Sequence, residues 1–141
     1  MSYCYVAIGA DLSRKLDTTY FVKIGKAKEP EKRTFSQRIE LVAFAPNEPI
    51  MGRLQIGGED IGPCISYKSL EFFLISKAQE LYGVNEIARG AGWTEMVGNF
   101  LYPYEALDAA EIIISMIHEI GDREIYRWDA DYGHQGDWCA T

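Results

Sequence analysis

Cysteine and histidine are scarce in this chain, and their scarcity limits the chemistry that it can carry. The 141 residues include three cysteines, Cys4, Cys64 and Cys139, and two histidines, His118 and His134. An odd number of widely spaced cysteines predicts neither a disulfide framework nor a zinc cluster. Cys4 stands in an apolar segment and is most simply a small buried residue. A catalytic cysteine would need a histidine partner, and the sequence offers little support for that alternative.

Long apolar runs are missing as well. The longest uninterrupted apolar runs are a few residues, so the sequence predicts no membrane-spanning helix. Met1-Ser2-Tyr3 leads straight into an apolar segment, without the basic start and apolar core of a signal peptide. We therefore expect a cytoplasmic protein. A hydrophobic content of 48% in 141 residues is typical of one compact domain rather than a disordered chain.

The signatures of nucleotide-binding loops are also absent. Residues 50–64 are rich in glycine, yet they contain neither a Gly-Lys-Ser nor a Gly-x-Gly-x-x-Gly sequence. Clustered glycines with a proline predict a loop, in which only residues 53–56 alternate like a short strand.

Positive charge is scarce overall but concentrated in one segment. The net charge is −7, whereas residues 23–38 hold six cations and two anions, a local charge of +4. Residues 105–141 hold nine anions and two cations. The simplest explanation of the basic segment is a solvated helix face with i,i+4 ion pairs. If the segment instead binds DNA, the acidic end must face away from the phosphates.

The basic segment follows a predicted strand. Residues 3–9 and 20–25 are rich in branched and aromatic side chains and predict an antiparallel pair of strands. Gly25 ends the second strand, and Pro30 stands where a helix extending to Arg38 would begin. A strand, a tight turn and a basic helix commonly present cations to a phosphate.

Three pieces of sequence occur in an order that points to a family. Residues 23–28 read Lys-Ile-Gly-Lys-Ala-Lys, and Arg33 follows Gly25 by eight positions. This order resembles the second half of the GIY-YIG nuclease signature, most of all that of the amino-terminal nuclease of the bacterial excision-repair endonuclease. Residues 3–6 stand where the family has Gly-Ile-Tyr, which places its tyrosine on Tyr5. Residues 69–75 resemble the helix with the metal-binding glutamate, here Glu71. The resemblance covers roughly residues 3–100.

The resemblance implies a fold and an activity. The fold would be a small α/β (α+β) domain, with a three-stranded antiparallel sheet flanked by helices, over residues 1–103. Residues 104–141 would add a helix and an acidic tail packed on the same domain. The activity would be that of a metal-dependent DNA endonuclease or nickase using Mg²⁺ or Mn²⁺, of the type encoded by phages or mobile elements.

The resemblance also assigns roles to individual residues. Glu71 would hold the metal, Arg33 would contact the scissile phosphate, and Tyr5 would orient or activate the water. Lys23 takes the place of the family's second tyrosine. The further cations expected to bind nucleic acid are Lys26, Lys28, Lys32 and Arg38.

Glu71 is unusual even without the resemblance. Residues 67–82 predict an amphipathic helix whose apolar stripe consists of Leu70, Leu74, Ile75, Ala78, Leu81 and Tyr82. With about 100° per residue, Glu71 falls inside that stripe. A carboxylate there is unfavourable unless a cation, a metal or a donor meets it. The alternatives to a metal are an ion pair with Arg33 or Lys68, or a stripe whose edge lies in solvent.

Two departures from the family pattern favour a different function. Lys23 replaces a tyrosine, as in a phage-associated branch with Lys-Ile-Gly, and supplies charge but no phenol. Gln37, four residues after Arg33, stands where the family often has tyrosine or histidine, and it cannot take a proton from water. The alternative is therefore a catalytically reduced relative that binds nucleic acid or a protein partner, for example as an inhibitor. A protein-only interaction module that uses the acidic tail is a third possibility.

The remaining predictions concern the rest of the chain. Residues 41–44 predict a third strand, and residues 92–95 loosely resemble a tryptophan-plus-acid signature in which Trp93 would be a core or lid residue. Residues 103–120 predict a second amphipathic helix. Its core-facing residues would be Leu107, Ala110, Ile113, Ile114 and Ile117. Residues 128–134 match no calcium loop, and we expect an acidic surface segment that docks by its aromatic side chains.

Overall fold

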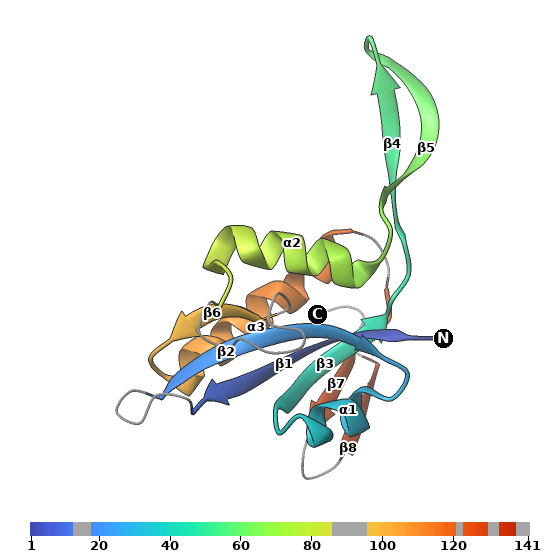
Figure 1. Ribbon diagram of the computed structural model, residues 1–141. Helices are drawn as coiled ribbons and strands as arrows, with labels where there is room; N and C mark the ends of the chain where they lie inside the picture. Colours follow the sequence, from blue (N-terminus) through green and yellow to red (C-terminus); the bar gives the residue numbers. More distant parts are fainter. Residues whose placement is uncertain (13–17, 86–95, 121–122, 130–132, 138–141) are drawn as a thin grey trace.

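The computed structural model describes residues 1–12, 18–85, 96–120, 123–129 and 133–137, which form a mixed α+β fold (Figure 1). A six-stranded antiparallel sheet has the order β6-β2-β1-β3-β7-β8, and a separate hairpin consists of β4 and β5. The elements are β1 (Tyr3–Asp11), β2 (Thr19–Ala27), α1 (Pro30–Ser36), β3 (Glu40–Pro46), β4 (Ile50–Ile56), β5 (Glu59–Tyr67), α2 (Leu70–Tyr82), β6 (Met96–Phe100), α3 (Pro103–Glu119), β7 (Tyr126–Asp129) and β8 (Gly133–Asp137). The α+β class is confirmed. The expected sheet was too small, because β6, β7 and β8 extend the three predicted strands.

The predicted strands and basic helix at the start of the chain are confirmed. β1 and β2 pair antiparallel, with Tyr5 opposite Gly25 and Ala7 opposite Lys23. α1 begins at Pro30 but ends two residues earlier than predicted. It ends because Arg38 adopts a left-handed conformation with a φ of 58°, which a continuing helix does not allow.

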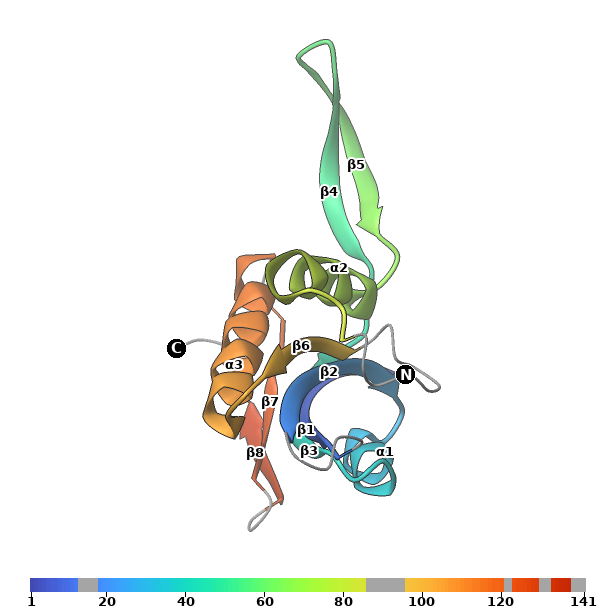
Figure 2. The same cartoon turned by 60° about the vertical axis from the view of Figure 1, so that its left-hand side comes forward.

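The sheet is covered on both faces, which explains why β1 and β2 are apolar almost throughout. α2 and α3 lie on one face, and α1 lies on the other (Figures 1 and 2). Alternation along β1 divides its side chains between two cores. Cys4 and Val6 belong to the core beneath α2 and α3, whereas Tyr5 and Ala7 belong to the core on the α1 face. Cys4 is therefore buried, as predicted.

Both long helices form where the apolar periodicity predicts them, but the buried face of each is rotated from the predicted one. The Ser69 hydroxyl accepts a hydrogen bond from the Phe72 amide and caps the start of α2. Leu81 and Leu107, both predicted to face the core, are 56% and 42% exposed. α2 instead turns Phe73 inward, so its buried side lies to one side of the predicted stripe. In α3 the other predicted core residues, Ala110, Ile113, Ile114 and Ile117, are buried. Among the described residues, no helix is long and apolar enough to cross a membrane.

The glycine-rich segment contains the short strand predicted at residues 53–56, but the residues around it do not form the predicted loop. It forms the β4–β5 hairpin, an arm that projects from the rest of the fold in both views (Figures 1 and 2). Gly57 and Gly58 form its turn, with φ values of 60° and 84°, as two-residue hairpin turns require. Pro63 fits within β5 because the two-stranded arm leaves that strand with a free edge among the described residues.

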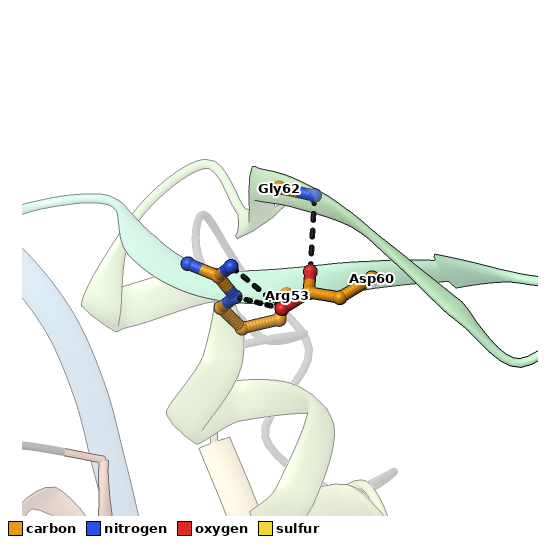
Figure 3. Close-up of polar contacts among 3 residues, drawn as sticks. All are labelled: Arg53, Asp60 and Gly62. Carbon is orange, nitrogen blue, oxygen red and sulfur yellow. Dashed lines mark hydrogen bonds and ion pairs between the residues drawn. The ribbon is translucent and has the colours of Figure 1, made fainter.

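One ion pair spans the arm. The Arg53 Nε and Nη2 atoms donate to Asp60 Oδ2 at 3.0 and 2.6 Å, and the Gly62 amide donates to Asp60 Oδ1 at 3.0 Å (Figure 3). Both charged side chains are exposed, so the pair stabilises the fold little. The pair does neutralise the single cation of the arm.

The described part of the acidic end is more regular than predicted, and Trp128 packs against the core on the α1 face, in line with a segment that docks by its aromatic side chains. Residues 126–129 and 133–137 form strands β7 and β8, which continue the sheet beyond β3. The Arg127 guanidinium forms a two-pronged ion pair with the Glu111 carboxylate, which connects β7 to α3. The described part of this end therefore packs on the same sheet as the basic segment. Its acidic helix, α3, lies on the face opposite α1, as DNA binding through the basic segment requires.

Tyr82 should make the stability of the fold depend on pH in the alkaline range. Its ring packs edge-on against Phe100, with centroids 5.7 Å apart, and burial raises the pKa of its phenol. Because the raised pKa penalises the phenolate only in the folded state, stability should fall as pH rises through about 10 and beyond. In urea unfolding, Tyr82→Phe should lose less stability than the wild type between roughly pH 9 and pH 11. Tyr104→Phe is the exposed control, and equal losses in all three proteins would contradict the prediction.

Candidate functional site

The basic segment forms an open depression where β2 runs into α1. Its volume is about 670 Å³, and it is lined by Ser2, Lys26, Ala27, Lys28, Glu29, Lys32, Arg33 and Ser36. The short helix sets the direction of these side chains. Pro30 and Thr34 face inward, and the Thr34 hydroxyl donates to the Pro30 carbonyl at 2.9 Å. The helical period then turns Lys32 and Arg33 toward solvent.

The depression concentrates positive charge in an acidic chain. Four cations and one carboxylate line it. The carboxylate, Glu29, pairs with Lys32 at 3.1 Å, and both side chains are largely exposed. In the described parts of the chain, no ion pair involves Lys26, Lys28 or Arg33. Three cations thus face solvent without a carboxylate, and an anionic ligand is the partner that such a field attracts.

Glu71 is outside the lining of this depression, and its helix, α2, lies on the face of the sheet opposite α1 and Arg33. It is half-buried in the first turn of α2, where its amide donates to Asn47 Oδ1 at 2.9 Å. The Asn47 amide in turn donates to the Ser2 carbonyl at 3.0 Å, and Ser2 lines the depression. Two hydrogen bonds therefore connect the start of α2 to the rim. In Figure 1 the amino end of α2 and the amino terminus of the chain lie at the same end of the sheet.

The acidic groups near the depression suit one kind of metal binding only. Among the described residues, no group of three or more histidine, cysteine, aspartate or glutamate side chains could hold a metal ion. A protein cage of the zinc or calcium type is therefore not present in that part of the chain. Mg²⁺ differs, because it retains several waters and takes one or two carboxylates together with substrate phosphates. Glu71 is a half-buried carboxylate of the kind that such an ion takes, but it lies on the helix that covers the face opposite the depression.

Tyr5 is buried beneath the end of α1. It is 1% exposed, and its hydroxyl donates to Gln37 Oε1 at 3.3 Å. Its ring lies over Gly25, where an added Cβ would come within 2.5 Å of the Tyr5 oxygen. Gln37 follows Arg33 by one helical turn, so the hydroxyl lies near the depression without being part of its lining.

The remaining predicted site residues are placed differently. Lys23 is 4% exposed and lies on the same face of the sheet as Tyr5, between Ala7 of β1 and Met96 of β6. Arg38 is exposed beyond the end of α1. Of the eight predicted site residues, the structure brings Lys26, Lys28, Lys32 and Arg33 together in the depression. Tyr5, Lys23, Glu71 and Arg38 lie outside its lining, and Trp93 lies outside the described residues.

Two features of the site were not predicted from the sequence. The first is Asn47, which connects Glu71 to Ser2 and which no local pattern distinguishes. The second is an aromatic pocket on the other flank of α1, lined by Tyr3, Glu31, Phe44, Tyr126 and Trp128. A signal existed for one member, because Tyr3 has the same strand parity as Tyr5 and so faces α1.

Comparison with protein-family models, with curated proteins and with solved structures finds no significant match to this chain.

Proposed function

We propose that the chain binds the phosphate backbone of DNA in the basic depression and hydrolyses phosphodiester bonds as a GIY-YIG-like endonuclease or nickase. The observation that carries the proposal is the depression itself, in which four cations gather although the chain has a net charge of −7. Cations placed on one surface release counterions from DNA, and this release drives backbone binding. The resemblance in residues 3–100 supports the hydrolytic step.

The nearby residues divide the chemistry of hydrolysis among them. Phosphodiester cleavage needs a cation at the developing charge and a nucleophilic water. Arg33 supplies the fixed positive charge in the depression, and its neighbours Lys26 and Lys28 hold the flanking phosphates. Glu71 would hold a Mg²⁺ or Mn²⁺ ion, which supplies further charge stabilisation and acidifies bound water. Tyr5 would orient the water, for which its hydroxyl has to leave Gln37 and reach solvent.

A second function has a specific observation in its favour. Tyr5 is 1% exposed and Lys23 is 4% exposed, so both positions that the family signature gives to tyrosine are closed to substrate. Burial of these two residues favours a catalytically reduced relative that binds DNA through the same depression. Such a relative would keep the contacts with the DNA phosphates but would not cleave the DNA.

A plasmid assay separates the two candidates. Supercoiled plasmid is incubated with the protein and Mg²⁺ or Mn²⁺, and binding to the same DNA is measured without metal. Metal-dependent conversion to nicked circles supports the nuclease. Binding without conversion supports the reduced relative, and absence of binding at low salt rejects both.

Arg33→Ala should weaken DNA binding about fivefold to tenfold. Loss of one phosphate contact should also lower the slope of log affinity against log salt by about 0.9 for duplex DNA. Fluorescence anisotropy over a salt series measures both quantities. Arg53→Ala is the matched control, because Arg53 lies on the arm, paired with Asp60 and outside the depression. Equal effects of the two substitutions would show that binding depends on net charge rather than on this depression.

A further inference from the structure

A second pocket lies against α1, on the flank away from the basic depression. Its volume is about 490 Å³, and it is lined by Tyr3, Glu31, Phe44, Tyr126 and Trp128. The four aromatic residues come from β1, β3 and β7, which are neighbours in the sheet. All four are half-buried, so part of each side chain remains accessible to a ligand.

Three of the four rings hold one another in place, and Trp128 packs against the core on the α1 face. Phe44 stacks on Tyr126 with centroids 5.4 Å apart, and Tyr3 meets Phe44 edge-on at 5.3 Å. The Tyr126 hydroxyl also donates to the Glu124 carboxylate, which orients that ring. Side chains ordered in this way lose little further freedom when a flat ligand stacks on them.

The aromatic pocket and the basic depression share the short helix α1. Glu31 faces the pocket, whereas its neighbour Lys32 faces the depression. The same division occurs at the start of β1, where Ser2, just before the strand, lines the depression and Tyr3, its first residue, lines the pocket. Because consecutive residues line the two sites, the sites adjoin across α1, and the inference requires one DNA strand to occupy both.

We propose that this aromatic pocket binds an unpaired nucleobase of the DNA whose backbone lies in the basic depression. The inference rests on the proposed function and adds the form of the substrate. The aromatic rings stack on the face of the base, and the Glu31 carboxylate accepts a hydrogen bond from an exocyclic amine. Adenine and cytosine carry such an amine and thymine does not. A base stacked inside a duplex exposes no face, so the substrate is single-stranded or locally unpaired DNA.

Aromatic rings beside a carboxylate also suit a cationic side chain of a protein. The neighbouring depression decides between the two ligands. Lys26, Lys28 and Arg33, which form no ion pair with any residue that the structure describes, would repel a basic peptide, whereas they attract the phosphates that carry a base. The nucleobase is therefore the ligand that both surfaces accept together.

Two single-stranded oligonucleotides test the inference on the unmodified protein. One carries 2-aminopurine at its central position, and the other is abasic there. The first should bind about tenfold more tightly, as expected for one stacked base. Its fluorescence should be quenched on binding. Trp128→Ala should abolish the difference by weakening only the base-containing oligonucleotide. Tyr104→Ala should leave it intact, because Tyr104 belongs to an exposed stacked tyrosine pair at the start of α3.

A second variant tests the role of the carboxylate without removing a ring. Glu31→Gln should abolish the preference for a central cytosine over a central thymine and leave the abasic affinity within about twofold, after correction for the lost charge. Circular dichroism checks that both variants are folded. The comparison of the two oligonucleotides uses the wild-type protein alone, so the test can still be made if a variant does not fold.

Each other outcome has a defined meaning. Equal affinities with a steep salt dependence would overturn the nucleobase inference and leave the proposed DNA binding standing. Absence of binding to either oligonucleotide would overturn both. Equal affinities together with quenching of protein fluorescence by tetramethylammonium would assign the pocket to a cation and also overturn the inference.

Discussion

Replacing Glu71 with glutamine should reduce metal-dependent nicking at least about a hundredfold and change DNA affinity less than about twofold. Glutamine keeps the size of the side chain but loses the negative charge that a divalent ion requires. The backbone amide of residue 71 still donates to Asn47, so the start of α2 remains attached to the rim of the depression. Nicking of supercoiled plasmid and anisotropy with labelled DNA measure the two quantities.

Glu80→Gln is the matched control for this substitution. Glu80 lies on the same helix, is exposed, and pairs with Lys77 at 3.7 Å. Its replacement should leave nicking unchanged. Nicking by Glu71→Gln at the wild-type rate in saturating Mg²⁺ would remove Glu71 from the mechanism. If the wild type does not nick, Glu71→Gln should raise DNA affinity slightly, because one negative charge near the phosphates is lost.

The elements that carry the basic depression could be predicted because their signals are local. Pro30 marks the start of α1, whereas β2 continues through Gly25 to Ala27, two residues beyond its predicted end. The cations are close in sequence, so almost any strand-to-helix connection brings them together. α2 and α3 were predictable for a similar reason, because a period of 3.6 residues is visible in a single segment.

The β4–β5 arm and the acidic end could not be predicted from the same kinds of signal. Both faces of the arm are largely exposed, so no burial alternates along its strands, and its glycines predict a loop equally well. Burial of β7 depends on its pairing with β3, more than eighty residues earlier in the chain.

Strand β6 was not predicted either. Gly98 within it has a φ of 80°, which interrupts the regular pattern of a strand.

Only the part of the site whose residues are close together in the sequence was predicted. The start of α2, with Glu71, is linked to the rim of the depression through Asn47 and Ser2, and neither residue has a sequence pattern that marks it. The aromatic pocket gathers residues from three strands that are distant in the chain. Their meeting follows from the sheet order, of which only the pairing of β1 with β2 was predicted.

Gly25→Ala should destabilise the protein by about 1–3 kcal/mol, which lowers its Tm by roughly 3–10 °C. The backbone of Gly25 does not require glycine, since its φ is not positive. The Tyr5 ring requires it, because a Cβ at position 25 would lie 2.5 Å from the Tyr5 oxygen and 2.6 Å from Cζ. Tyr5 is packed with Ala7, Ala27 and Leu41, so its ring cannot move without displacing that core. Thermal unfolding followed by circular dichroism measures the loss.

A double-mutant cycle distinguishes this clash from a general intolerance of position 25. Tyr5→Ala alone should cost about 3–5 kcal/mol, because it empties a buried aromatic site. In that background Gly25→Ala should cost almost nothing, since the atoms that it would meet are gone. The coupling energy should therefore be about 1–3 kcal/mol in the stabilising direction. Additive effects within about 0.5 kcal/mol would instead show that glycine is needed for a reason other than the tyrosine ring, and that the two halves of the family-like signature are not linked by packing.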